Sequence, residues 1–199
     1  MHHDQPWGNV SRRSVLISAA IVPIAAIRSA AQGPAKAPPS GLSPDQLRLV
    51  DAIADRLIPR DENGPGASDC GAANYIDRLL GDENAAEKPS FVEGLTALDA
   101  VAAKSHGKPF VELTPEMKDA VLTEVESTAA SRAFFTRIRR LTLEGTFSDP
   151  FYGGNKGFAG WDLIGYPGPR LAVGPDEQKM HIAIKPVHIS VWGGANSGH

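Results

Sequence analysis

The side chains in this sequence with the richest chemistry belong to one cysteine and six histidines. A single cysteine, Cys70, cannot form a disulfide within the chain. It also cannot by itself provide a structural zinc site, an iron–sulfur cluster or a C-x-x-C-H haem attachment. His181 and His188 are separated by a segment that contains Pro186, which does not place two metal ligands on one regular element. The sequence therefore predicts neither a metal nor a covalently attached cofactor in this chain.

Two loop patterns could bind a ligand. The first is a group of polar residues within glycine-rich sequence, namely Asp61, Glu62, Asn63 and Asp69. Carboxylates of this kind can bind Ca²⁺, but the ligand spacing of an EF-hand is absent, so a solvated loop is the preferred interpretation. The second is G-x-x-G-x-x-G over residues 154–160, which we expect to lack the strand before it and the helix after it that a dinucleotide site needs. With no G-x-S-x-G elbow and no Walker loop either, we predict no catalytic residue and no nucleotide site.

The overall composition is that of an ordinary globular protein. The chain has 199 residues, of which 42% are hydrophobic and 22% charged, and this excludes a disordered or fibrous protein for most of its length. Lys and Arg number 20 and Asp and Glu number 23, which gives a net charge of −3. Because nucleic-acid binding needs a basic surface, we expect no nucleic acid partner. The length fits one domain with an appendage.

The appendage is predicted to be an export signal over residues 1–31. Arg12 and Arg13 precede an apolar run of 13 residues, which matches the core of a signal peptide and falls short of the roughly 20 residues that span a bilayer. Arg28 closes this run, as is typical of a twin-arginine (Tat) signal. A plain basic segment of a general secretory signal is the alternative. We therefore expect a periplasmic protein exported by the Tat pathway.

Export has a consequence for Cys70, which lies in a turn-rich segment. In an oxidising compartment, an unpaired cysteine is either buried or joined to a cysteine of another chain. We expect Cys70 to be buried, and a disulfide to a partner chain is the alternative.

A linker rich in proline and alanine at 32–41 is expected to be extended and to lead into a helical domain at 42–147. Ser43-Pro44 is a typical helix start, and apolar residues recur from it at helical spacing as far as Pro59. The same reasoning predicts further helices at 72–80, 91–106, 114–125 and 133–147. The expected fold is all-α, a compact array of about five helices.

Two side-chain placements follow from the helical periodicity. Met117 is expected in the buried stripe of the fourth helix, together with Val121. Arg137 is expected with the other charged residues of the fifth helix on a solvated face, in preference to a binding patch.

Residues 148–199 have a different composition. From 148 to 174 the chain is rich in glycine, proline and aromatic residues, which fits neither a helix nor a long strand. Its aromatic side chains bury too much surface for a disordered linker, so we predict a long ordered loop that packs on the same domain. Such a loop is suited to contact another protein or a flat ligand. Alternating apolar residues then predict two short extended segments in the tail, around 180–184 and 187–191.

Several motifs carry a resemblance to a known family. They are IADRLIPR at 53–60, DPFYGGN at 149–155, Gly160-Trp161, and IGYPG at 164–168, together with the paired arginines at 12 and 13. With these motifs the sequence resembles gluconate 2-dehydrogenase subunit 3 over most of residues 11–170. That family also contains the small subunits of fructose, sorbitol and glucose dehydrogenases.

The resemblance implies a non-catalytic small subunit, without activity of its own, bound to a large flavoprotein of the glucose–methanol–choline (GMC) type. FAD and the substrate pocket are then in the large subunit. A multihaem cytochrome c subunit with haem c passes electrons to ubiquinone, so that contact with the cytoplasmic membrane is indirect. The small subunit is implied to help the flavoprotein mature and to carry it across the membrane by the Tat signal.

The aromatic loop is the predicted partner-binding segment. The residues that we expect to contribute are Asp149, Pro150, Phe151, Tyr152, Gly153, Gly154, Asn155, Phe158, Trp161, Gly165, Tyr166 and Pro167. The alternative is that the segment wraps its own helices with the aromatic side chains pointing inward, and Trp161 distinguishes the two arrangements.

Two other classes of function stay open at this point. One is a freestanding periplasmic enzyme that acts on a sugar with carboxylates and aromatic residues of 149–166, and the other is a carbohydrate-binding module. Either would be a stable monomer with measurable affinity for sugars, whereas a subunit would expose an apolar patch that its partner covers.

Overall fold

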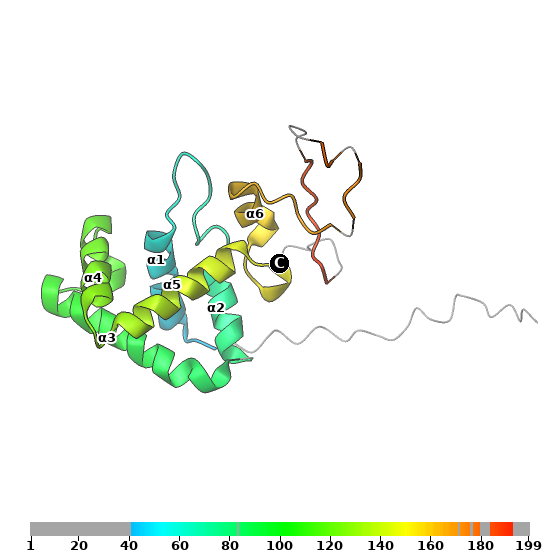
Figure 1. Ribbon diagram of the computed structural model, residues 1–199. Helices are drawn as coiled ribbons and strands as arrows, with labels where there is room; N and C mark the ends of the chain where they lie inside the picture. The colour runs from blue at the N-terminus through cyan, green and yellow to red at the C-terminus, as the bar shows by residue number, and fades with distance from the viewer. Residues whose placement is uncertain (1–40, 83, 171, 176, 180–183, 193–199) are drawn as a thin grey trace, which may run out of the picture. The chain divides into compact units, whose positions relative to one another are not determined.

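The computed structural model describes residues 41–192 except 83, 171, 176 and 180–183. The first 40 residues, including Arg12, Arg13 and the predicted export signal, lie outside the described residues. The described part contains the α-helices α1 (Pro44–Leu57), α2 (Ala72–Gly81), α3 (Lys88–His106), α4 (Pro115–Ser127), α5 (Arg132–Phe147) and α6 (Ala159–Leu163). It contains no strand, so the predicted all-α fold is confirmed (Figure 1). None of the helices in this part is long and apolar enough to cross a bilayer.

The predicted helix starts form capping interactions. Ser43 Oγ accepts from the backbone N–H of Gln46 at 3.3 Å, and Gln46 Oε1 accepts from the N–H of Ser43 at 2.9 Å. These bonds satisfy donors that the first turn of α1 would otherwise leave free. Thr114 Oγ1 accepts from the N–H of Met117 at the start of α4. Gly107 ends α3 with φ 72°, a left-handed conformation that favours glycine.

The hydrophobic core lies between α1 to α5 and the 3-10 helix η3 (Phe110–Glu112). Its most deeply buried side chains are Val50, Ile53, Ile76, Leu80, Phe91, Leu95, Leu98, Phe110, Val121, Val125, Ile138 and Leu141. α2 and α5 are in close contact, since a Cβ on Gly145 would lie only 2.9 Å from the Cα of Ala72. Glycine at this position permits the close approach. The segment that follows α5 therefore starts next to α2.

Two side chains differ from the prediction. Met117, in the first turn of α4, is exposed although it shares a stripe with the buried Val121. Arg137 is not on a solvated face. Its guanidinium pairs with Glu87 and lies 5.4 Å from the ring centre of Phe91. Because a cation is attracted to an aromatic face, Arg137 joins α5 to the start of α3.

The segment after α5 contains more helix than predicted. It forms two 3-10 turns, η4 (Pro150–Tyr152) and η5 (Lys156–Phe158), and then α6. Local propensity is a weak prior, and tertiary hydrogen bonds override it here. The expected extended segments of the tail form no strand in the described residues, and 180–183 lie outside them.

An ion pair between α1 and α4 makes stability depend on pH. Arg56 Nε and Nη2 donate to the two carboxylate oxygens of Asp119 at 2.9 and 2.8 Å. The hydrogen bonds from Arg56 hold the pKa of Asp119 below its usual value. A carboxyl whose pKa is lower in the folded state stabilises the fold above its unfolded pKa of about 3.9. This contribution is lost as the pH falls through the folded pKa.

We therefore expect Asp119→Asn to lower the free energy of unfolding near neutral pH by less than about 1 kcal/mol, since half of the Asp119 side chain is exposed. The difference from the wild type should shrink as the pH falls through the lowered pKa of Asp119 and the carboxyl of the wild type becomes protonated. Urea unfolding at neutral and acidic pH measures both values. An equal loss at both would show that the charge of Asp119 does not stabilise the fold.

Candidate partner-binding surface

Asn155 determines the course of the segment after α5. Its φ of 45° lies in the left-handed region, where asparagine is one of the few non-glycine residues found. Its buried side chain donates from Nδ2 to the carbonyl of Ser148 and accepts at Oδ1 from the N–H of Gly160, both at 2.8 Å. Its own N–H donates to the carbonyl of Gly145 at 2.8 Å. One residue thus ties together the end of α5, the turn and α6.

Two glycines allow this segment to lie directly against α5. A Cβ on Gly154 would lie 2.0 Å from the carbonyl oxygen of Gly145, and a Cβ on Gly160 would lie 1.9 Å from that of Thr146. No side chain fits at such distances. These glycines of the G-x-x-G-x-x-G pattern therefore serve packing against α5. A short helix, α6, does follow the pattern, which corrects our expectation that none would.

Phe158 and Trp161 point into the protein. Trp161 is 4% exposed, and its Nε1 donates to the carbonyl of Phe147 at 2.9 Å. The ring centres of Phe158 and Tyr166 lie 5.2 and 4.9 Å from that of Trp161. Of the predicted partner-binding residues, those in the interior are Pro150, Gly154, Asn155, Phe158 and Trp161. These buried residues support the exposed part of the segment after α5 from within.

The remaining predicted residues are exposed or half-buried: Asp149, Phe151, Tyr152, Gly153, Gly165, Tyr166 and Pro167. Phe151 and Tyr152 form a pair at the surface, with ring centres 5.4 Å apart in an edge-to-face arrangement. Arg78 of α2 holds the pair in place. Its Nη1 donates to the carbonyl of Phe151 at 2.8 Å, and its guanidinium lies 5.7 Å from the ring centre of that residue.

The tail adds an exposed aromatic residue that the sequence analysis did not single out. Trp192 is 61% exposed, and its ring centre lies 5.5 Å from that of Phe151. The carboxylate of Asp149 fixes this arrangement, since it accepts from the N–H groups of Phe151 and Val191, both at 2.9 Å. We call Phe151, Tyr152 and Trp192 the aromatic surface. The alternating apolar pattern of the tail was the only sequence signal for an exposed residue here, but such a pattern does not show which face of the segment is covered.

Exposed large hydrophobic side chains are concentrated in this part of the chain. Nine of the twelve in the described residues lie between 151 and 192: Phe151, Tyr152, Ile164, Tyr166, Val173, Ile184, Ile189, Val191 and Trp192. The other three, Val111, Met117 and Leu143, are in the helical domain. Among the nine, Phe151 contacts both Tyr152 and Trp192, and an exposed apolar patch of this kind marks contact with another molecule.

Cys70 lies beneath the same segment. It is fully buried, and its carbonyl accepts from the N–H of Lys156 at 2.9 Å. Burial, and then the charge of Asp69, raises the pKa of the Cys70 thiol, so the thiol stays protonated and unreactive. The expected burial of Cys70 is confirmed. A disulfide to a partner chain would require the turn to open.

The acidic residues around Cys70 do not gather into one site. Asp69 pairs with Arg60 and accepts from the N–H of Gly66, while Asp61 accepts from the N–H of Asn63. These bonds lower the pKa of both carboxyls. Nowhere in the described residues do three His, Cys, Asp or Glu side chains come together in a group that could hold a metal ion.

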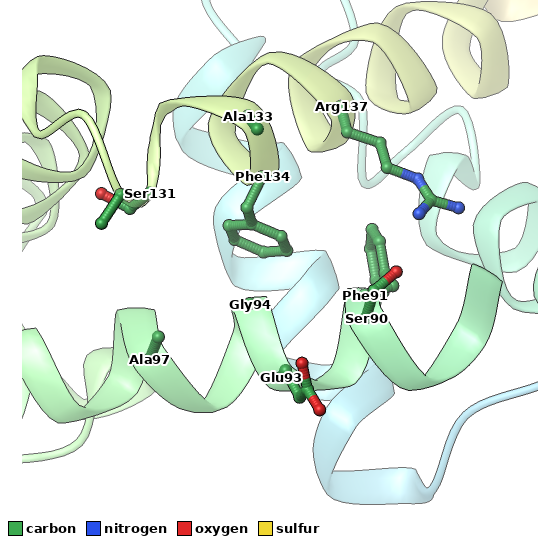
Figure 2. Close-up of a pocket in the computed structure, with 10 residues that line it drawn as sticks. Ser90, Phe91, Glu93, Gly94, Ala97, Ser131, Ala133, Phe134 and Arg137 are labelled. Carbon is green, nitrogen blue, oxygen red and sulfur yellow. The ribbon is translucent and has the colours of Figure 1, made fainter.

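A separate groove of about 440 Å³ runs between α3 and α5. Figure 2 shows Phe134 of α5 lying over Gly94 of α3, where a Cβ would be 2.1 Å from the ring. Arg137 is the only cation among the lining residues, and it is already engaged by Glu87 and Phe91. Ser90, Glu93 and Ser131 add further polar groups to a mostly apolar lining, and Nε of Arg137 has no hydrogen-bond partner.

The fold and these contacts define a small all-helical chain that presents a fixed group of exposed aromatic side chains. The family model described as gluconate 2-dehydrogenase subunit 3 matches residues 44–168, more than half of the sequence, and the chain belongs to this family. The family description makes its members subunits of a gluconate dehydrogenase with several chains. Comparisons with curated proteins and with solved structures gave no match.

Proposed function

We propose that this chain is the non-catalytic small subunit of an FAD-dependent gluconate, sugar or polyol dehydrogenase. Its aromatic surface binds a large flavoprotein subunit of the GMC type, which holds FAD and the substrate pocket. A multihaem cytochrome c subunit receives the electrons and connects the complex to the periplasmic face of the cytoplasmic membrane. The chain helps the flavoprotein to mature and carries it across the membrane by its Tat signal.

The observation that carries the proposal is the concentration of exposed apolar side chains at 151–192, joined to a helical domain of a subunit family. Leaving a large aromatic side chain in water forgoes the free energy that its burial would release, about 25 cal/mol per Å² of apolar surface. Aromatic residues also dominate the binding energy of many protein interfaces. A partner protein that covers Phe151, Tyr152 and Trp192 accounts for their exposure.

The aromatic surface is held in one arrangement before any partner arrives. Phe151 is restrained by Arg78 on one side and by the carboxylate of Asp149 on the other. Beneath it, Asn155 fixes the backbone to α5. A surface that is already ordered loses less conformational entropy on binding, which favours association.

The sugar-binding alternatives receive less support from the geometry. The cavity beside the aromatic surface, lined in part by Arg78, Asp82 and Tyr152, has a volume of about 50 Å³. Pockets that enclose small ligands have volumes of roughly 300–1,000 Å³. A sugar could stack on the aromatic surface but could not be enclosed by it.

Binding is tested by co-expressing the tagged chain with its large subunit and measuring how much large subunit is retained. We expect Phe151→Ala and Tyr152→Ala each to weaken binding by about 2 kcal/mol, roughly 30-fold, with little change in the melting temperature of the chain. Leu143→Ala, on an exposed apolar residue of α5, is the matched control and should bind normally. If both aromatic variants retained as much large subunit as the wild type does, the aromatic surface would be excluded as the binding site. Sugar binding by the isolated chain that both variants lose would favour a carbohydrate-binding module.

Export is tested separately with the Arg12→Lys, Arg13→Lys double variant. Lysine keeps the charge but lacks the planar guanidinium group, so a receptor that recognises its geometry should reject the variant. We expect both this chain and the large subunit to accumulate in the cytoplasm. Normal dehydrogenase activity in the periplasm of the double variant would contradict the export role and leave the binding role untouched.

A further inference from the structure

Residues 184–192, which we call the strap, are attached to the segment after α5 through a series of contacts (orange to red in Figure 1). Arg170 Nη2 donates to the carbonyl of Lys185 at 2.6 Å, and the N–H of Val187 donates to the carbonyl of Pro167 at 2.9 Å. Further along, His188 Nε2 lies 2.8 Å from Asp162 Oδ1. With the bond from Val191 to Asp149 described above, the strap is fixed along its length.

The side chains of the strap have the reverse of the usual polarity. The ring of His188 stacks on the buried Phe158, with ring centres 5.0 Å apart and planes only 6° from parallel, and Ser190 is buried. Their neighbours Ile189 and Val191 are 47% and 63% exposed. From His188 to Val191, alternate side chains therefore point to opposite sides, as in an extended chain. The chain turns at Val191 and Trp192, and both of these side chains are exposed. Ser190 faces the protein and His188 lies against Phe158 with 42% of its side chain exposed, whereas the β-branched Ile189 and Val191 face away from the protein.

Hydrophobic burial alone would favour the opposite orientation, with Ile189 and Val191 inside. The bonds to Asp149 and Asp162 hold the strap in the observed orientation instead. The outer face is also continuous with the aromatic surface, because Trp192 packs against Phe151. A partner that covers Phe151 and Trp192 therefore reaches the residue next in the chain, Val191.

We propose that the outer face of the strap, formed by Ile189, Val191 and Trp192, contacts an apolar surface of the large flavoprotein subunit and determines which large subunit this chain accepts. The inference rests on the proposed function, since it assigns the strap to the partner that Phe151 and Tyr152 bind. The family match ends at residue 168, so the strap lies outside the part of the chain that the family model describes. The matched part supplies Phe151 and Tyr152 to the contact, and the strap adds to binding and supplies selectivity.

The test compares Ile189→Asp and Val191→Asp with Val111→Asp in the full chain, co-expressed with its own large subunit. Val111 is an exposed residue of η3, so the control carries the same new charge outside the strap. An aspartate in an apolar contact would have to lose its hydration. We expect the strap variants to bind the large subunit at least tenfold more weakly and Val111→Asp to bind normally. The melting temperatures of all three should stay close to that of the wild type, because the sites are exposed.

Two further measurements address contact and selectivity. A photo-crosslinking amino acid at position 191 should attach to the large subunit, and the same group at position 111 should not. The Ile189→Ser, Val191→Ser double variant should lose the preference of the wild type for its own large subunit over that of another family member.

The outcomes separate the two proposals. Wild-type binding and selectivity in all strap variants, together with lost binding in Phe151→Ala, would overturn the role of the strap and leave the proposed function standing. Wild-type binding in the variants of the strap and of Phe151 and Tyr152 would overturn both. Weaker binding with unchanged selectivity would contradict the assignment of selectivity to the strap.

Discussion

Replacing Trp161 by alanine is expected to destabilise the chain by about 3–5 kcal/mol, the usual cost of truncating a buried tryptophan. The change removes the hydrogen bond to the carbonyl of Phe147 and the contacts with the rings of Phe158 and Tyr166. A domain of this size has a total stability of roughly 5–15 kcal/mol. The variant should therefore unfold at a much lower temperature or denaturant concentration than the wild type.

Trp192→Ala provides the matched control, because it removes the same side chain from an exposed position. We expect it to leave the melting temperature almost unchanged and to weaken binding of the large subunit. Thermal unfolding of both variants and retention of the large subunit measure the contrast. A Trp161→Ala variant that melts like the wild type but fails to bind would mean that Trp161 is an interface anchor, contrary to its inward packing.

Replacing Gly160 by alanine is expected to cost about 3 kcal/mol, near the upper end of the range for overpacking. The new Cβ would lie 1.9 Å from the carbonyl oxygen of Thr146, and neither backbone segment can move without breaking other contacts. A shift of α6 would break the bond from the N–H of Gly160 to Asn155 and displace the neighbouring Trp161. Urea unfolding measures this loss.

The matched control for Gly160→Ala is Gly174→Ala. The nearest atom that a Cβ on Gly174 would meet is Glu177 Oε2 at 3.8 Å, an ordinary contact distance. This change should alter stability by less than about 0.5 kcal/mol. Equal stability of the two alanine variants would indicate that the segment after α5 is not packed against Thr146 as described.

These two expected losses bear on the aromatic surface. Trp161 and Gly160 do not contribute to the exposed rings, but they hold the backbone that presents Phe151 and Tyr152. A variant at either position should therefore bind the large subunit more weakly as a consequence of lost structure. Binding losses are informative about contact only in variants whose melting temperature is unchanged.

The sequence alone determined the helical domain, because the signals that define it are short-range. A capping residue acts within one turn, and apolar periodicity is read along one helix, so the start of α1 at Ser43 and the end of α3 at Gly107 could be predicted. The motifs at 53–60 and 149–168 likewise indicated the family that the model match confirms. The solvated placement of Arg137 was wrong because its partner Glu87 precedes another helix.

Tertiary structure alone decided which aromatic side chains of 149–192 face outward. A glycine-rich segment has many accessible backbone conformations, so its local sequence does not select one of them. The choice is made by bonds to distant parts of the chain, such as those from Asn155 to Gly145 and from Lys156 to Cys70. Trp161 and Trp192 are the same residue type, yet one is buried and the other exposed. The difference arises because the carbonyl of Phe147 and the ring of Phe158 are available to Trp161, whereas Trp192 packs against Phe151 and stays 61% exposed.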